Sequence, residues 1–115
     1  MNDEVFGSLA LDAMGGDMGA PEVVEGLRLA LDAMASNSLE EPVLLVGRQE
    51  ELQSALRNVG LNGDPRVRVV HADEVIGMDE KPMIAMKKKR GSSMMTALDL
   101  VKSSRAKAIL SCGNT

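Results

Sequence analysis

A short, unbroken apolar segment between two amphipathic segments places the strongest constraint on the fold. Residues 42–46, PVLLV, contain no polar or charged side chain and are followed by Gly47. A half-buried strand alternates apolar and polar residues, whereas a strand that is covered on both faces has a continuous apolar sequence. We therefore expect residues 42–46 to form a central strand of a sheet that carries helices on both faces.

Helical periodicity flanks this segment on both sides. Pro21 suits the first turn of a helix, and Glu22 lies near the positive end of its dipole. The apolar residues of this helix recur at helical spacing and predict one buried stripe: Val23, Val24, Leu27, Leu31 and Met34. A second helix is expected over residues 49–59, and Gly60 suits the position after its end.

Further strands and helices alternate along the rest of the chain. Strands are expected over residues 8–13, 66–71 and 107–111, and a short helix over residues 82–88. Ser92 or Ser93 is suited to cap one more helix, whose predicted apolar face contains Met94, Ala97, Leu98 and Val101. Strands that alternate with helices pair in parallel through right-handed crossovers. The sequence predicts a three-layer α/β/α domain with a mainly parallel sheet.

The composition determines the kind of core and the broad class of protein. One Phe, no Tyr, no Trp and nine Met among 115 residues leave an aliphatic core. The net charge of −4 does not favour nucleic-acid binding, and a single Cys excludes an internal disulfide. No apolar run approaches the roughly 20 residues of a membrane span, and the acidic N-terminus lacks the regions of a signal peptide. We expect a soluble cytoplasmic protein.

Two loops that follow strands combine glycine with small polar residues. MGGDMGAP follows the first strand and SCGNT follows the fourth. In an open α/β sheet, ligands bind at the carboxyl ends of the strands, and glycine lets them approach the main-chain amides. The loops predict a site for phosphate or another oxyanion, formed by Gly15, Gly16, Asp17, Gly113, Asn114 and Thr115. The alternative is that both loops are only tight turns, since the glycine spacing matches neither the dinucleotide fingerprint nor the P-loop.

Other polar side chains have both a chemical and a structural interpretation. Asp12 and Asp17 would repel a phosphate, so we expect them to accept N–H groups of the loop or to orient a lysine. His71 is a candidate acid or base or, alternatively, a strand-end residue whose ring is satisfied. The basic run either docks an acidic partner or is a solvated helix end; it contains Lys87, Lys88, Lys89 and Arg90.

Three segments, in this order, resemble the bacterial phosphate acyltransferases of phospholipid synthesis. They are LDAMGGDMGAPEVVEG (residues 11–26), VHADEVIGMDEKP (70–82) and the segment over residues 87–115, which ends in AILSCGNT. Two features depart from the family pattern. Met18 and Gly19 make the first loop one residue longer, and Cys112 stands where the family has Ala, which argues against a catalytic thiol.

The resemblance implies the fold of the isocitrate and isopropylmalate dehydrogenases and acyl transfer from acyl-[acyl carrier protein] to inorganic phosphate. In that reaction phosphate itself is the nucleophile, so no Ser or Cys need be acylated, and we expect no cofactor and no metal. For this reaction we expect Asn114 and His71 to be catalytic, the loop glycines, Asp17 and Thr115 to bind substrate, and residues 87–90 to bind the carrier protein. The resemblance also implies a cytoplasmic homodimer at the inner face of the membrane, beside a membrane-bound glycerol-3-phosphate acyltransferase.

Two alternative functions stay open: a related short-chain acyl-coenzyme A:phosphate acyltransferase, and a protein that binds the carrier without catalysis. The chain stops four residues after its last predicted strand, where a further covering helix is expected. Residues 1–115 are therefore expected to be the N-terminal part of a single α/β acyltransferase domain, truncated after the fourth strand and inactive alone.

Overall fold

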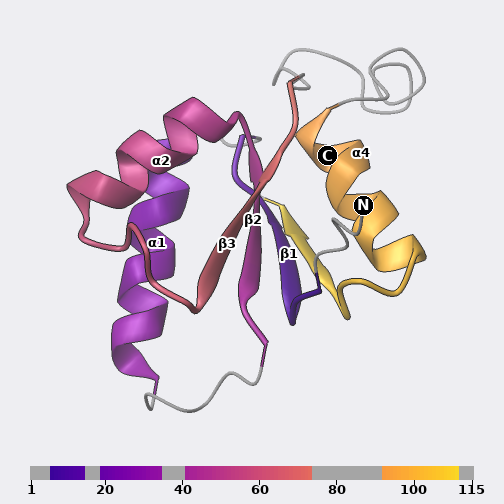
Figure 1. Cartoon of the computed structure of the whole chain (residues 1–115), viewed down its shortest axis with the longest axis horizontal. Helices are drawn as coiled ribbons and strands as arrows, with labels where there is room; N and C mark the ends of the chain where they lie inside the picture. The colour runs from indigo at the N-terminus through magenta and orange to yellow at the C-terminus, as the bar shows by residue number, and fades with distance from the viewer. Residues whose placement is uncertain (1–5, 15–18, 35–40, 74–91, 112–115) are drawn as a thin grey trace.

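The computed structural model describes residues 6–14, 19–34, 41–73 and 92–111. Strands and helices alternate within them as β1 (Leu9–Asp12), α1 (Ala20–Ala33), β2 (Val43–Gly47), α2 (Gln49–Asn58), β3 (Val67–His71), α4 (Ser93–Lys102) and β4 (Ile109–Ser111). The four described strands form one parallel sheet in the order β3–β2–β1–β4. Helices α1 and α2 cover one face of the sheet and α4 covers the other (Figure 1). The predicted three-layer α/β/α architecture is confirmed.

The apolar segment predicted as a central strand is β2, which pairs with β1 on one side and β3 on the other. All of its residues are buried. Val43 and Leu45 belong to the hydrophobic cluster under α1 and α2, whereas Leu44 and Val46 belong to the cluster under α4. Because helices cover both faces of β2, both of its alternating sets of side chains are apolar.

The first two helices begin and end close to the predicted positions. α1 begins at Ala20, one residue earlier than predicted, so Pro21 still lies in the first turn, where its missing N–H needs no partner. After α2, Gly60 has a φ of +77°, and the Leu61 N–H donates to the Leu56 carbonyl oxygen (2.8 Å). This is the Schellman arrangement that a glycine at this position favours.

Two assignments of apolar side chains to helix faces are corrected by the structure. Met34 lies beyond the end of α1 and is 38% exposed, so it does not extend the buried stripe. α4 buries Ser93, Ala97 and Leu100, whereas Met94 and Leu98 are only partly buried. The cluster between α4 and the sheet is rich in alanine, so small side chains occupy the contact and the larger ones lie at its margin.

The first and fourth strands are slightly shorter than predicted. The fourth strand begins at Ile109 instead of residue 107, and the first strand covers Leu9–Asp12. The short helix predicted over residues 82–88 lies outside the described residues.

The core is aliphatic, as predicted, and Phe6, the single aromatic residue of the chain, is 50% exposed. In the described part of the chain, no helix has both the length and the apolar character needed to cross a membrane.

Candidate functional site

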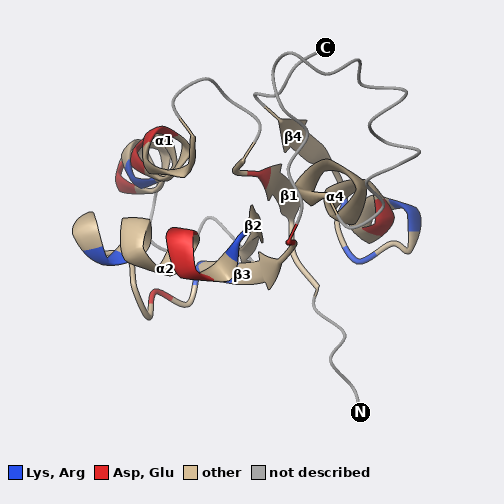
Figure 2. Cartoon of the chain, turned by 90° about the horizontal axis from the view of Figure 1, so that it is seen from above, with Lys and Arg blue, Asp and Glu red and all other residues tan. Residues whose placement is uncertain are grey.

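The order of the strands changes direction at β1. The chain adds β2 and then β3 on one side of β1, and later returns to add β4 on the other side. Seen from above in Figure 2, α1 and α2 lie on one side of the strands and α4 on the other. In open parallel sheets, ligands bind at the carboxyl ends of the strands where the order reverses. The candidate site is therefore the edge at which β1 ends with Asp12 and β4 ends with Ser111.

A buried carboxylate joins these two strand ends. Asp12 is 1% exposed and lies directly opposite Ser111 in the parallel pairing of β1 with β4. The Ser111 hydroxyl donates a hydrogen bond to Asp12 Oδ2 (2.8 Å). The two residues are 99 positions apart in the chain, so this bond fixes the spacing between the ends of two strands that are distant in sequence.

The other oxygen of the same carboxylate holds the start of the first glycine loop. The Met14 N–H donates to Asp12 Oδ1 (3.2 Å), a bond to a residue two positions on that is typical of Asp at a turn. The Met14 side chain is buried against Gly47, where an added Cβ would lie 2.6 Å from Met14 Cγ. The expectation that Asp12 accepts an N–H group of the loop is confirmed.

The N-terminus of α1 follows this loop and begins at the same edge of the sheet, because α1 is the element after β1. Its N-cap is Gly19, whose φ of +76° favours glycine. Among the described residues, no side chain caps α1. In general, the first N–H groups of a helix can bind an anion.

His71 lies at the carboxyl end of β3, opposite Gly47 of β2. Its Nδ1 accepts a hydrogen bond from the N–H of Gln49 at the start of α2 (3.1 Å), and its Nε2 contacts the carboxylate of Asp73. The His71 ring therefore caps α2, whereas the side chain of Arg48, the N-cap residue of α2, makes no capping hydrogen bond. β2 separates β3 from β1, a distance of about 10 Å at the usual strand spacing, so the structure does not bring His71 next to Asp12.

The remaining predicted site residues lie outside the described part of the chain: Gly15, Gly16, Asp17, Lys87, Lys88, Lys89, Arg90, Gly113, Asn114 and Thr115. Their roles stay predictions. What the structure does place side by side are the two strand ends from which both glycine loops continue. In the described residues, no group of three or more His, Cys, Asp or Glu is suited to hold a metal ion.

Two contacts at this edge have no local sequence signal. Ser111 was noted only as the first residue of the segment SCGNT, and its partner becomes visible only when β4 is paired with β1. Gly47 was recognised as the end of a strand, but its contact with Met14 depends on the register between β1 and β2. Both contacts are products of topology, which local sequence patterns do not encode.

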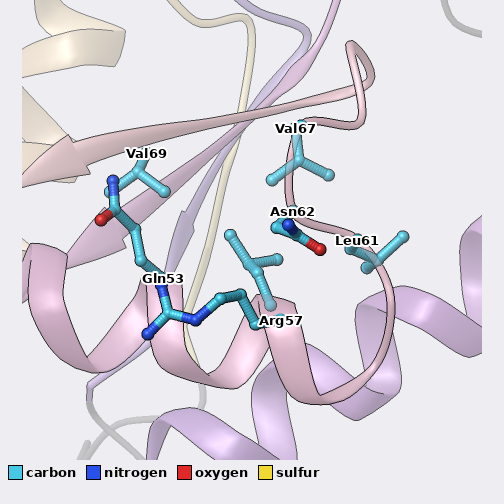
Figure 3. Close-up of a pocket in the computed structure, with 8 residues that line it drawn as sticks. Gln53, Arg57, Leu61, Asn62, Val67 and Val69 are labelled. Atoms are coloured by element: carbon cyan, nitrogen blue, oxygen red, sulfur yellow. The ribbon is translucent and has the colours of Figure 1, made fainter.

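A separate hollow lies at the opposite edge of the sheet, between the second half of α2 and the beginning of β3 (Figure 3). It is lined by Gln53, Leu56, Arg57, Leu61, Asn62, Gly63, Val67 and Val69. At the same edge, Arg66 Nη2 pairs with Asp64 Oδ2 (2.9 Å), and hydrogen bonds from the Arg66 side chain and backbone lower the pKa of Asp64. This edge carries the amino end of β3, whereas Asp12 and Ser111 lie at the carboxyl ends of their strands.

The comparisons with known proteins cover the loops as well as the described core. The family model for fatty acid synthesis proteins matches residues 8–115. The chain is 43% identical over 108 residues to a phosphate acyltransferase of Aeromonas salmonicida, covering 94% of this chain and 31% of that protein. It is 46% identical over 108 residues to a phosphate acyltransferase of Akkermansia muciniphila, covering 93% and 30%. The chain thus spans about a third of the length of the curated relatives that it matches. With nearly every residue inside the matched region, the chain belongs to the family of fatty acid synthesis proteins.

Proposed function

We propose that the full-length protein transfers a fatty acyl group from acyl-[acyl carrier protein] to inorganic phosphate and so supplies acyl phosphate for phospholipid synthesis. Relatives that are 41–46% identical carry the name phosphate acyltransferase, which supports the reaction class. The structural observation that carries the proposal is the adjacency of β1 and β4 where the strand order reverses. Two loops rich in main-chain donors then begin side by side at one ligand-binding edge.

The reaction needs a phosphate dianion beside a thioester and donors for the charge that develops on the carbonyl oxygen. An oxygen of HPO₄²⁻ attacks the thioester carbonyl carbon, and the carbon–sulfur bond breaks as the tetrahedral oxyanion collapses. The proton of HPO₄²⁻ ends on the departing thiolate, so the products are acyl phosphate and a free thiol. No acylated side chain is required. Main-chain N–H groups and neutral amides stabilise such an oxyanion without repelling the second anion.

We assign the substrate-binding role to the two loops, with Gly15, Gly16, Asp17, Gly113 and Thr115 holding phosphate or the thioester carbonyl. Asn114 is the proposed oxyanion donor, because its amide donates hydrogen bonds without adding charge. His71 is the second catalytic candidate of this proposal. With Nδ1 accepting from the Gln49 N–H, Nε2 is the ring nitrogen that carries a proton in the neutral form.

The partners follow from the chemistry of substrate and product. Carrier proteins are acidic, so the basic run over residues 87–90 is proposed to steer the acyl carrier protein to the site. Acyl phosphate combines an apolar chain with a charged head, which suits consumption by a membrane-bound glycerol-3-phosphate acyltransferase. We propose that the protein acts as a cytoplasmic homodimer at the inner face of the membrane, as the family resemblance implies.

The test uses full-length protein, inorganic phosphate and two acyl donors supplied separately, long-chain acyl-[acyl carrier protein] and short-chain acyl-coenzyme A. Acyl phosphate is trapped with hydroxylamine and counted against the release of free thiol. The proposal predicts one acyl phosphate per thiol released from the carrier-protein donor. Product from acyl-coenzyme A alone would replace the proposed donor with the short-chain alternative. Binding of the carrier protein without any acyl phosphate would favour the non-catalytic alternative.

A further inference from the structure

We propose that Asp12 is a positioning residue for acyl transfer, which acts through Met14 and Ser111 to hold the starting points of both glycine loops at a fixed spacing. The inference rests on the proposed function, because it concerns the site assigned to that reaction. Asp12 itself is enclosed in the protein and is not proposed to touch substrate, since it is 1% exposed.

The burial of Asp12 is unusual for a carboxylate. Among the described residues, Asp12 is the one charged side chain in the buried set, whose other polar members are Ser92 and Ser93. Burying a carboxylate is unfavourable unless hydrogen bonds compensate for the lost water. In the part of the chain that the structure describes, Asp12 accepts two such bonds, and no ion pair joins it to a cation.

The two hydrogen bonds go to two different segments of the chain. Oδ1 accepts from the Met14 N–H, which directly precedes Gly15, and Oδ2 accepts from the Ser111 hydroxyl, which directly precedes Cys112 and Gly113. One short side chain therefore sets the position of the last described residue before each loop. Main-chain donors contribute to catalysis only when they are held in the correct place before reaction, so a defined loop spacing matters for the rate.

A positioning role makes a specific prediction about the negative charge. An Asn side chain at position 12 keeps the shape of Asp: its Oδ1 accepts from the Met14 N–H, and its Nδ2 donates to the Ser111 hydroxyl oxygen. If Asp12 acts only by holding Met14 and Ser111 in place, Asp12→Asn should retain most of the activity, because it keeps both hydrogen bonds. If the charge itself were required, Asp12→Asn would be as defective as Asp12→Ala.

The experiment compares Asp12→Ala, Asp12→Asn and Ser111→Ala in the full-length protein. The control is Asp64→Ala, which removes a partly buried, hydrogen-bonded carboxylate at the opposite edge of the sheet. Asp12→Ala is expected to lower kcat by about 10²-fold, the scale of a misplacement of about 1 Å, with a smaller change in KM for phosphate. Ser111→Ala removes the hydrogen bond to Asp12 Oδ2 but keeps the bond to the Met14 N–H, and it is expected to lower kcat by about tenfold. Asp12→Asn should retain most of the turnover, and Asp64→Ala should lose thermal stability while keeping its turnover.

Wild-type turnover in folded Asp12→Ala would overturn the inference, and so would equal losses in Asp12→Asn and Asp12→Ala. If Asp12→Ala does not fold, wild-type turnover in Ser111→Ala would overturn it instead. Hydrogen exchange distinguishes a failure of this inference from a failure of the proposed function. Even in a protein that forms no acyl phosphate, Asp12→Ala must speed exchange of the Met14 amide hydrogen more than Asp64→Ala does, because it removes the acceptor of that N–H. Equal exchange rates in the two variants would refute the hydrogen bond between Asp12 and Met14.

Discussion

Gly47, the last residue of β2, offers a direct test of how the first glycine loop is seated. A Cβ atom at this position would lie 2.6 Å from Met14 Cγ, 2.8 Å from Met14 Sδ and 3.2 Å from Leu52 Cδ1. Carbon atoms in contact prefer about 3.5–4.0 Å, so the Met14 side chain must retreat by about 1 Å. The Met14 backbone is not free to follow, because its N–H is bound to Asp12 Oδ1 (3.2 Å).

We expect Gly47→Ala to lower the free energy of unfolding by about 1–3 kcal/mol, the range for inserting a methyl group into a packed site. Gly26→Ala is the matched control. Gly26 lies at an exposed position within α1, and nothing lies within 4 Å of a Cβ built on it. There the same substitution should raise the free energy of unfolding by about 0.5–1 kcal/mol, because glycine is a poor helix residue.

The assay is urea denaturation of the single variants Gly47→Ala, Gly26→Ala and Met14→Ala and of the double variant Gly47→Ala/Met14→Ala. Met14→Ala removes the atoms that the new methyl group would meet. The double variant should therefore be less destabilised than the sum of its singles by at least about 0.5 kcal/mol. Strictly additive losses, or a Gly47→Ala variant as stable as the wild type, would refute the proposed contact.

Three further predictions concern caps, turns and pH. Ser92→Ala should lower the free energy of unfolding by about 1 kcal/mol, because the Met95 N–H loses the Ser92 hydroxyl (3.1 Å); thermal unfolding measures this, and no change would contradict the cap. Gly60→Ala should lower the free energy of unfolding by about 1–2 kcal/mol, because Gly60 has a φ of +77°. Gly60→Asn should lower it less, and equal losses in the two variants, measured by urea denaturation, would contradict this explanation. The Arg66 side chain lowers the folded-state pKa of Asp64 from its ordinary value of 3.8. The stabilisation from this pair should be complete above that value and disappear as the pH falls through the lower folded-state pKa. Asp64→Asn should flatten this acid limb when urea midpoints are compared between pH 2 and 7, and an unchanged limb would contradict the assignment.

The central layer of the fold was predictable because its signals are local. The uninterrupted apolar run at residues 42–46 indicated a strand with both faces covered, and β2 contributes alternate residues to the clusters on its two faces. Gly60 likewise marked the end of α2 through a backbone conformation that glycine adopts readily. In each case the information lies within a few residues of the element that it specifies.

The buried face of α4 was less predictable, because apolar character alone does not decide which residues face a sheet. Met94 and Leu98 are more apolar than Ser93, yet Ser93 is the buried residue. Ala10 on β1 and Ala97 on α4 share one cluster, so the contact is built from small side chains. Ser93 fits such a contact, and the longer side chains lie at its margin.

The site predicted at the two glycine loops stays a prediction, because the loop residues lie outside the described part of the chain, and the bond that joins the two strand ends was not predicted. Parallel strands implied that both loops leave the same edge of the sheet, whereas the pairing of β1 with β4 is a property of the strand order. Asp12 was expected to bind a loop N–H group, but its bond to Ser111 spans 99 positions and has no local signal. The partner that satisfies the His71 ring, the Gln49 N–H, was hidden for the same reason.

The most direct test of the central claim is steady-state kinetics of acyl-phosphate formation by full-length wild-type protein, Gly16→Val and Asn114→Ala. Asn62→Ala is the matched control for the second variant, because it removes an exposed amide at the opposite edge of the sheet. We expect Gly16→Val to block turnover and Asn114→Ala to lower it about 10²-fold or more, as expected for an oxyanion donor, while Asn62→Ala matches the wild type. Wild-type turnover and phosphate affinity in both folded loop variants would contradict the assignment of the site to these loops and leave them as tight turns.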